Sequence, residues 1–200
     1  MNPELSHGDH AQGELSGRIS QCLSREVRMF DALMHPKLVH IPVALAVLMP
    51  LLSSGLLLAW FRGWFPRRTW VIAAALQGVL AVTAFAALKS GEVDEEIVEN
   101  VVSEDAIHEH EEYAEKFLIV SIVVFLLSAA ALFVPREGIA VGLAGVTVIG
   151  TLVVFWLAYE TGEHGGKLVY ELGAANAHIL ENAGTIPQPG SGRDDDDDDD

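Results

Sequence analysis

The sequence predicts an all-α membrane protein: a four-transmembrane-helix up-and-down bundle, with an amphipathic N-terminal helix and a disordered acidic C-terminal tail. Half of the 200 residues are hydrophobic. Four apolar segments are each about as long as the roughly 20 residues that span a bilayer, and none contains a charged residue. A helix in a soluble core keeps a polar face toward water, so these segments indicate membrane spans. They cover residues 41–61, 70–88, 117–134 and 138–159.

An N-terminal arm, residues 1–34, precedes the first span. Residues 1–13 are rich in glycine, histidine and acids, which is typical of disorder. In residues 14–34 the apolar side chains recur near helical spacing, which favours an amphipathic helix lying along the membrane surface. The first span begins about forty residues into the chain and exceeds the roughly 7–15-residue apolar core of a signal peptide, so we do not expect it to be cleaved.

The transmembrane domain is expected over residues 35–182, followed by a flexible acidic tail over residues 183–200. The tail ends in seven aspartates, which cannot form a packed core. The formal net charge of −16 argues against nucleic acid as a partner, because phosphate binding needs a basic face. The single cysteine, Cys22, excludes an intramolecular disulfide and a C-x-x-C-H site for covalent haem attachment.

The charges between the spans predict how the bundle is oriented. The connection after the first span is short and basic, with Arg62, Arg67 and Arg68, so we expect it on the cytoplasmic side. Both termini and an acidic loop over residues 89–116 then face outward. The expected location is the cytoplasmic (inner) membrane, as a multi-pass protein in contact with lipid.

Histidines are concentrated at the outward ends of the predicted spans. Five of the eight lie there, namely His35, His40, His108, His110 and His164. Residues two apart on a helix point about 200° apart, so only one of His108 and His110 can face the bundle. The main candidates for binding a cofactor or metal are His40, His110 and His164. Secondary candidates are His35, His108, Glu96 and Glu111. Gly165 and Gly166 either let the backbone approach a flat ligand or end the helix.

Imidazole is a ligand for haem iron, copper and zinc, and side chains on facing helices of a bundle can hold a haem. The sequence therefore favours a b-type haem-binding membrane subunit for electron transfer, with a cytochrome c-type or other redox protein as a partner. One alternative is a His/Glu site for a transition metal such as copper, zinc or iron. The other is a cofactor-free structural subunit of an oligomer or larger membrane complex. An electron-transfer or structural subunit is favoured over a stand-alone enzyme.

The segment HPKLVHIPVAL, residues 35–45, resembles the motif that opens a family of small four-helix bacterial membrane proteins of unknown function. The likeness extends to about residue 173. It implies the four-helix fold and, because some members are joined to cytochrome c domains, a link to electron transfer. The positions that match the family are His35, His40, Gly91, His110, Glu111, Gly162, Gly165, Gly166 and Tyr170. Where relatives carry a histidine in the last block, this chain has Leu172, so a ligand there is absent or replaced by His164 or His178.

Overall fold

The computed structural model describes residues 35, 37–99, 101–174 and 176–177. The predicted amphipathic helix, the acidic tail and His178 lie outside these residues. Four long helices and one short 3₁₀ helix make up the described elements: α2 (His40–Phe61), η2 (Arg67–Trp70), α3 (Val71–Val98), α4 (Glu104–Phe133) and α5 (Glu137–Tyr170). The four α-helices are long and apolar enough to cross a membrane, so the predicted all-helical fold with four helices that could span a membrane is confirmed.

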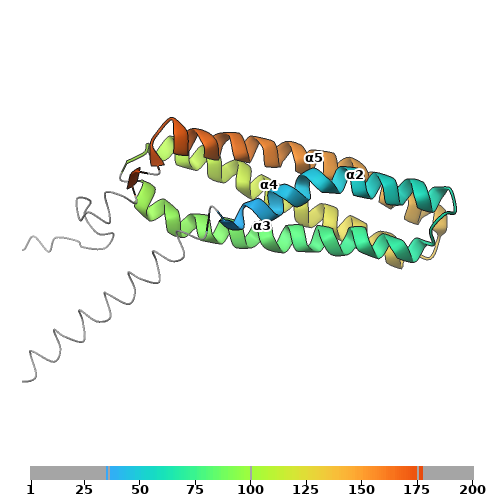
Figure 1. Cartoon of the computed structure of the whole chain (residues 1–200). Coiled ribbons are helices and arrows are strands. Elements are labelled where there is room, and N and C mark those ends of the chain that lie inside the picture. Colours follow the sequence, from blue (N-terminus) through green and yellow to red (C-terminus); the bar gives the residue numbers. More distant parts are fainter. Residues whose placement is uncertain (1–34, 36, 100, 175, 178–200) are drawn as a thin grey trace, which may run out of the picture.

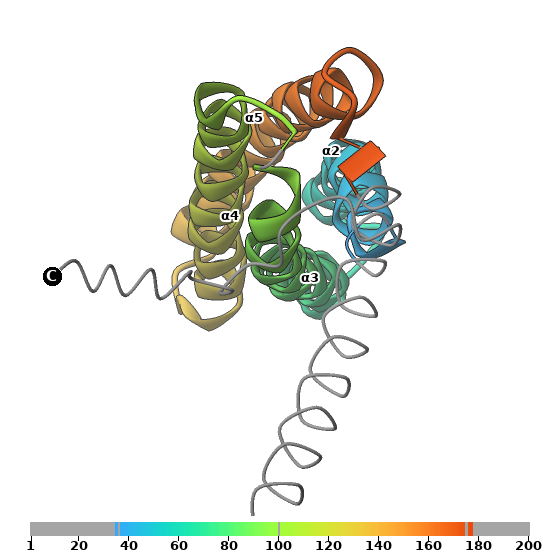
Figure 2. The ribbon, with the colours of Figure 1, turned by 90° about the vertical axis from the view of Figure 1, so that its left-hand side faces the viewer.

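The chain runs up and down through the bundle (Figure 1). Seen along the bundle, the four helices stand around a common interior (Figure 2). In the described part of the chain each helix packs against the next one in the order α2, α3, α4, α5, and α5 closes the ring against α2. All four segments therefore bring their ends into two layers, one at each end of the bundle.

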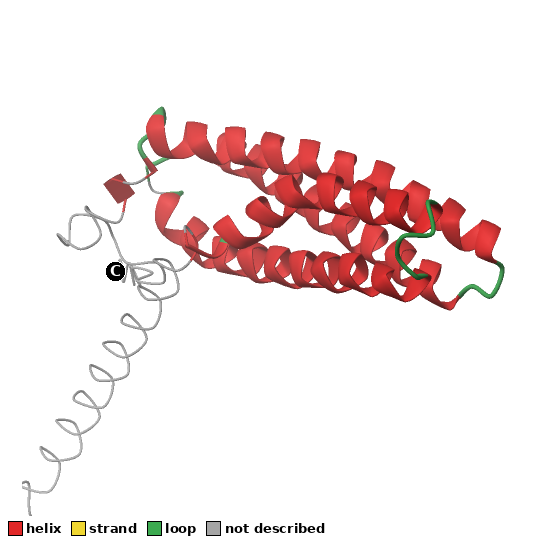
Figure 3. Ribbon diagram, turned by 45° about the vertical axis from the view of Figure 1, so that its right-hand side comes forward, coloured by secondary structure: helices red, strands yellow, loops and turns green. Residues whose placement is uncertain are grey.

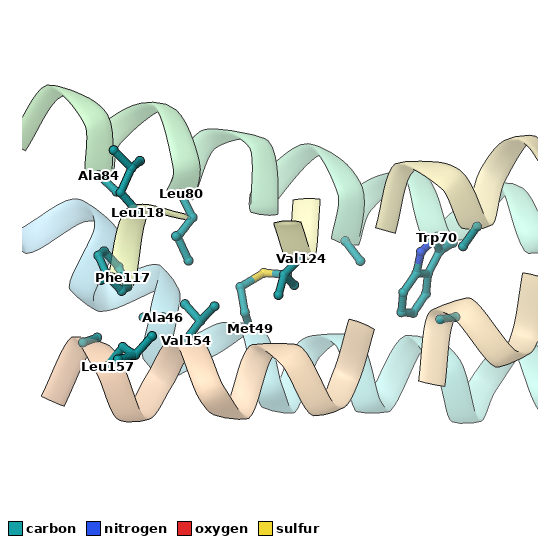
Figure 4. Close-up of a cluster of buried hydrophobic side chains, with 14 of the residues drawn as sticks. Ala46, Met49, Trp70, Leu80, Ala84, Phe117, Leu118, Val124, Val154 and Leu157 are labelled. Carbon is teal, nitrogen blue, oxygen red and sulfur yellow. The ribbon is translucent and has the colours of Figure 1, made fainter. Parts of the chain in front are cut away.

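The bundle interior is narrow and rich in alanine. Ala46, Met49, Leu80, Val124 and Val154 are almost completely buried between the helices (Figure 4). Larger apolar side chains such as Leu51, Phe61 and Phe133 are exposed on the outside. Small residues inside and large apolar residues outside are what a membrane bundle needs, because close helix contact and not burial from water holds it together.

One end of the bundle, which we call the arginine end, carries Arg62, Arg67, Arg68 and Arg136. It is the right-hand end in Figure 3, where two green loops connect the helices. Gly63 turns the chain after α2 with φ +72°, a conformation that is easy only for glycine. The Arg67 guanidinium then reaches α4, where it donates hydrogen bonds to the carbonyl oxygens of Ala131 (Nη2–O 2.6 Å, Nε–O 3.1 Å) and Val134 (Nη2–O 2.6 Å). These carbonyls end α4 and have no partner within the helix.

At the other end the helices run much further than the apolar segments. The expected loop over residues 89–116 is wrong: α3 continues to Val98 and α4 begins at Glu104. Likewise α5 continues through Gly162, Gly165 and Gly166, so these glycines do not end the helix. Its C-terminus is followed by Gly173 at φ +77°. At 1.5 Å per residue, α5 is about 50 Å long, well beyond a hydrocarbon core of about 30 Å.

Candidate functional site

The end opposite the arginines, which we call the histidine end, is formed by the start of α2 and α4 and by the end of α3 and α5 (left in Figure 1). His35, His40, His108, His110 and His164 all lie there. It is also the acidic end of the molecule, because the charged extensions of α3, α4 and α5 begin and end in this layer. The side chains differ sharply in where they point.

His35 lies in the helical turn before α2 and packs against α3. Its Nδ1 is 3.0 Å from the carbonyl oxygen of Ala87 and 2.9 Å from the hydroxyl of Ser90. The edge of the ring lies against Gly91: a Cβ added there would come within 3.1 Å of His35 Cε1. Gly91 therefore gives the imidazole the room it needs beside the α3 backbone.

His110, in the second turn of α4, makes the same kind of contact with α5. Its Nδ1 is 3.1 Å from the carbonyl oxygen of Thr161. A Cβ added to Gly165 would lie 3.0 Å from His110 Cε1. In both contacts the carbonyl belongs to the residue four positions before the glycine, so the bundle uses one arrangement twice, once in each pair of neighbouring helices.

These hydrogen bonds indicate which ring nitrogen carries the proton. A carbonyl oxygen only accepts, so Nδ1 of His35 and of His110 donates, and in a neutral imidazole the lone pair is then on Nε2. Ser90 Oγ itself donates to the Ala87 carbonyl at 2.8 Å, which leaves the hydroxyl oxygen free to accept from His35. Within the described residues no hydrogen bond reaches Nε2 of either histidine, and this is the atom suited to bind a metal.

His164 is held at both ring nitrogens. Nδ1 is 2.8 Å from the carbonyl oxygen of Glu160, and Nε2 is 3.3 Å from a carboxylate oxygen of Glu109 on α4. The ring stacks on Tyr113, with centroids 4.5 Å apart and planes at 21°, and the side chain is only 12% exposed. His164 is therefore an inter-helix contact whose Nε2 is already engaged. The pKa of His110 is lowered first by burial and then by its neighbours His35 and His164, so the three imidazoles share one neighbourhood.

The remaining candidates are not brought into this neighbourhood. His40 is exposed on the outside of α2, and the His108 side chain is 82% exposed. A Cβ at Gly166 would meet no described atom within 4 Å, so no described residue packs closely against this glycine. The side chain of Glu96 lies outside the described part of the structure.

Two glutamates form an acidic contact between α3 and α4. Burial raises the pKa of Glu95, and so do a hydrogen bond to Glu111 and the negative charges of Glu111, Glu99 and Glu92. A carboxyl group with a raised pKa holds its proton at higher pH than usual. Glu95 and Glu111 can therefore share a proton beside the histidines. The structure thus shows the predicted candidate Glu111 as a hydrogen-bonding partner of Glu95.

No group of three or more histidine, cysteine, aspartate or glutamate side chains gathers as a metal site among the described residues. The number of available ligands matters for the kind of cofactor that the histidine end could bind, because a bare transition metal usually takes several protein ligands. A haem brings four nitrogen ligands of its own and takes only one or two from the protein.

Several residues of this arrangement were not expected from the sequence. Ala87 and Thr161 act through backbone carbonyls, which carry no side-chain signal, and Ser90 is an ordinary small residue. Tyr113 lies three residues after His110, so helical spacing alone places it on nearly the same face. That spacing is the one available signal for the stack on His164.

Fold and site together describe a helical protein that could cross a membrane four times, with two imidazoles anchored at one end. A comparison with models of protein families found no match, and neither did comparisons with curated proteins and with solved structures.

Proposed function

We propose that this protein is a membrane subunit that binds a b-type haem at the histidine end and transfers electrons there. The observation that carries the proposal is the paired anchoring of His35 and His110: each donates from Nδ1 to a backbone carbonyl and keeps Nε2 available. Metal-binding histidines commonly use this arrangement, because the hydrogen bond fixes the tautomer and the orientation of the ring. A haem bound there supplies an iron that accepts and releases one electron.

The chain's own groups prepare the two imidazoles. The carbonyls of Ala87 and Thr161 hold the Nδ1 protons, and the Ser90 hydroxyl adds a second acceptor for His35. Gly91 and Gly165 keep the space beside each ring open. His35 thus replaces His40 as the favoured partner of His110, since His40 is exposed, and His164 is favoured as a neighbouring group that affects the site through its charge.

Orientation and partner belong to the same proposal. The arginine connection favours the cytoplasmic side, so the histidine end faces outward. Its exposed carboxylates include Glu104, Asp105, Glu109, Glu112 and Glu163. Such a surface attracts a basic redox protein and speeds its encounter. The resemblance of residues 35–45 to a family with cytochrome c-linked members supports this direction.

A structural subunit is the second candidate, favoured by one face of α5. Gly138, Gly142 and Gly145 lie there, and a Cβ at any of them would meet no described atom within 4 Å. Glycines spaced three to four residues apart let another helix approach closely. A partner helix on this face would make the protein an anchor in a larger complex, with or without a cofactor.

The test is the visible absorption spectrum of detergent-purified protein, expressed with haem supplied, oxidised and then reduced with dithionite, together with a pyridine haemochrome assay. We expect a Soret band and sharp α and β bands on reduction. His35→Ala and His110→Ala should remove them, whereas His40→Ala and His108→Ala, at the same end but exposed, should not. A featureless spectrum would overturn the haem proposal. Metal analysis would then distinguish a metal-binding protein from a structural subunit without a cofactor.

A further inference from the structure

Six polar side chains are completely buried in the interior of the bundle, away from the histidine end. We call them the polar string: Ser53 on α2, Gln77 on α3, Ser121 and Ser128 on α4, and Thr147 and Thr151 on α5. Each is 0% exposed, so they point between the helices and not toward lipid. All four helices contribute, which places the string in the common interior.

Contacts show how the string is laid out. Gln77 Nε2 donates to the Ser121 carbonyl at 3.4 Å, and the hydroxyls of Ser53 and Thr151 are 3.5 Å apart. Ser121 and Ser128 are seven residues apart on α4, which is about 10 Å along the helix. The string therefore runs through about 10 Å of the apolar part of the bundle.

The hydroxyls of the string fall into two groups. Ser53, Thr147 and Thr151 donate to carbonyls of their own helices, at Met49 (2.6 Å), Leu143 (3.0 Å) and Val148 (2.7 Å). This is the ordinary way in which a helix satisfies a buried hydroxyl. Ser121 Oγ and Ser128 Oγ do not do so, and with Gln77 Oε1 they have no hydrogen-bond partner in the described part of the chain. Three buried polar atoms thus face the interior unpaired.

Such atoms are costly in an apolar interior, because hydrocarbon offers no hydrogen bond in place of water. Buried water is the usual remedy, and it binds where two or more polar groups converge. The groups here are all neutral, and none of the apolar segments carries a charge, so an ion would be left uncompensated. The ligand must be neutral, must donate to Gln77 Oε1, and must also pair with a hydroxyl.

We infer that the polar string binds water inside the bundle between Gln77 and Ser121, where two unpaired polar groups lie close together. The unpaired Gln77 Oε1 and Ser121 Oγ mark its position. This hydration site is independent of the histidine end and of any cofactor bound there.

Alanine substitutions test the inference by the sign of their effect on the full-length protein, with folding measured by reversible unfolding in mixed micelles. If water is bound, Ser121→Ala removes one of its partners, and the folding equilibrium constant should fall roughly 3- to 10-fold. If the site is dry, alanine removes an unpaired polar group, and the variant should equal or exceed the original protein in stability. The second result overturns the inference.

Ser54→Ala is the matched control, since this hydroxyl lies on the lipid side of α2 and is already bonded to the Pro50 carbonyl at 2.6 Å. It should change the equilibrium constant by less than about twofold. A second readout is infrared spectroscopy after exchange into ¹⁸O-labelled water. The unsubstituted protein should show isotope-shifted O–H stretching bands of bound water that are missing from Ser121→Ala. Identical spectra for the two proteins would overturn the inference even if stability fell.

Discussion

The two ends of the bundle are closed in different ways. At the arginine end, Arg67 binds directly to the last carbonyls of α4, and Trp60 and Trp70 pack with ring centroids 6.2 Å apart. At the histidine end, three contacts between helices pass through an imidazole ring, at His35, His110 and His164.

The difference lies in what can change. A guanidinium stays charged throughout the physiological pH range, and an indole does not titrate. An imidazole changes its charge near neutral pH, and it can bind a metal through one ring nitrogen while the other donates a hydrogen bond. The arginine end is therefore built to stay fixed, whereas the histidine end holds its helices together with the same groups that can bind a ligand.

Removal of Arg67 should have the largest effect. Arg67→Ala takes away the charged N–H donors that satisfy the Ala131 and Val134 carbonyls, and should lower the free energy of unfolding by about 2–4 kcal/mol. Unfolding in mixed micelles measures this loss. Arg68→Ala, next in sequence but exposed, should cost much less. Equal losses in the two variants would mean that the bonds to α4 do not close this end.

At the histidine end, Gly165→Ala should come next. The new Cβ would lie 3.0 Å from His110 Cε1, and displacing the ring from α5 should cost about 1–3 kcal/mol. Gly166→Ala, in the same helix but with open space around it, should be neutral or stabilising because alanine favours helix over glycine. Thermal unfolding of both variants compares them. Equal thermal stability of the two variants would show that Gly165 does not make room for the His110 ring.

Ser90→Ala should have a smaller effect. His35 Nδ1 loses one acceptor but keeps the Ala87 carbonyl, so the loss should be about 0.5–1.5 kcal/mol. Nitrogen-15 spectra of the imidazoles should still show His35 protonated at Nδ1. A switch of the proton to Nε2 would show that the hydroxyl, and not the carbonyl, sets the tautomer.

The smallest effect is expected at Glu95, which is half-buried. Its pKa is raised in the folded protein, first by burial and then by Glu111. The folded state therefore binds this proton more tightly than the unfolded state, and the associated stability is present at low pH and lost as the pH rises through the raised pKa. At neutral pH Glu95→Gln should be more stable than the unsubstituted protein, and the advantage should shrink as the pH falls through the raised pKa toward the usual value of 4.5. Unfolding measured across pH checks this, with Glu99→Gln, an exposed neighbour, as the control. An advantage that grows on acidification would contradict it.

The sequence is sufficient to predict the four apolar helices, because uncharged apolar segments of about 20 residues are rare outside membrane spans. It failed at their ends. Charged residues lower hydropathy without lowering helix propensity, whereas glycine lowers both. From hydropathy we expect residues 89–116 to be a loop, and Gly165 and Gly166 to be a helix end or a ligand-facing segment. The structure instead extends α3 to Val98, begins α4 at Glu104 and includes both glycines in α5.

The direction in which each histidine points was equally hard to predict. His40 was favoured over His35 because it lies closer to the apolar segment. Yet the turn before α2 carries His35 inward onto Gly91, while His40 points outward. The depth of a residue along a helix follows from its number. Which residues face the bundle depends on how the helix is rotated about its own axis relative to its neighbours, and a single sequence does not give that rotation. For the same reason, the sequence does not predict which backbone carbonyl each imidazole ring binds.

The unbroken length of α5 has a mechanical consequence. From Gly138 to Gly165 the helix rises by 27 residue steps, about 40 Å, without a break between its apolar segment and the contact with His110. It therefore acts as a lever: a tilt of about 5° at the lipid end moves the far end by about 3.5 Å. Helices adjust their tilt to the thickness of the bilayer. A change in the tilt of α5 would therefore shift Thr161 and Gly165, the two α5 residues that hold the His110 ring.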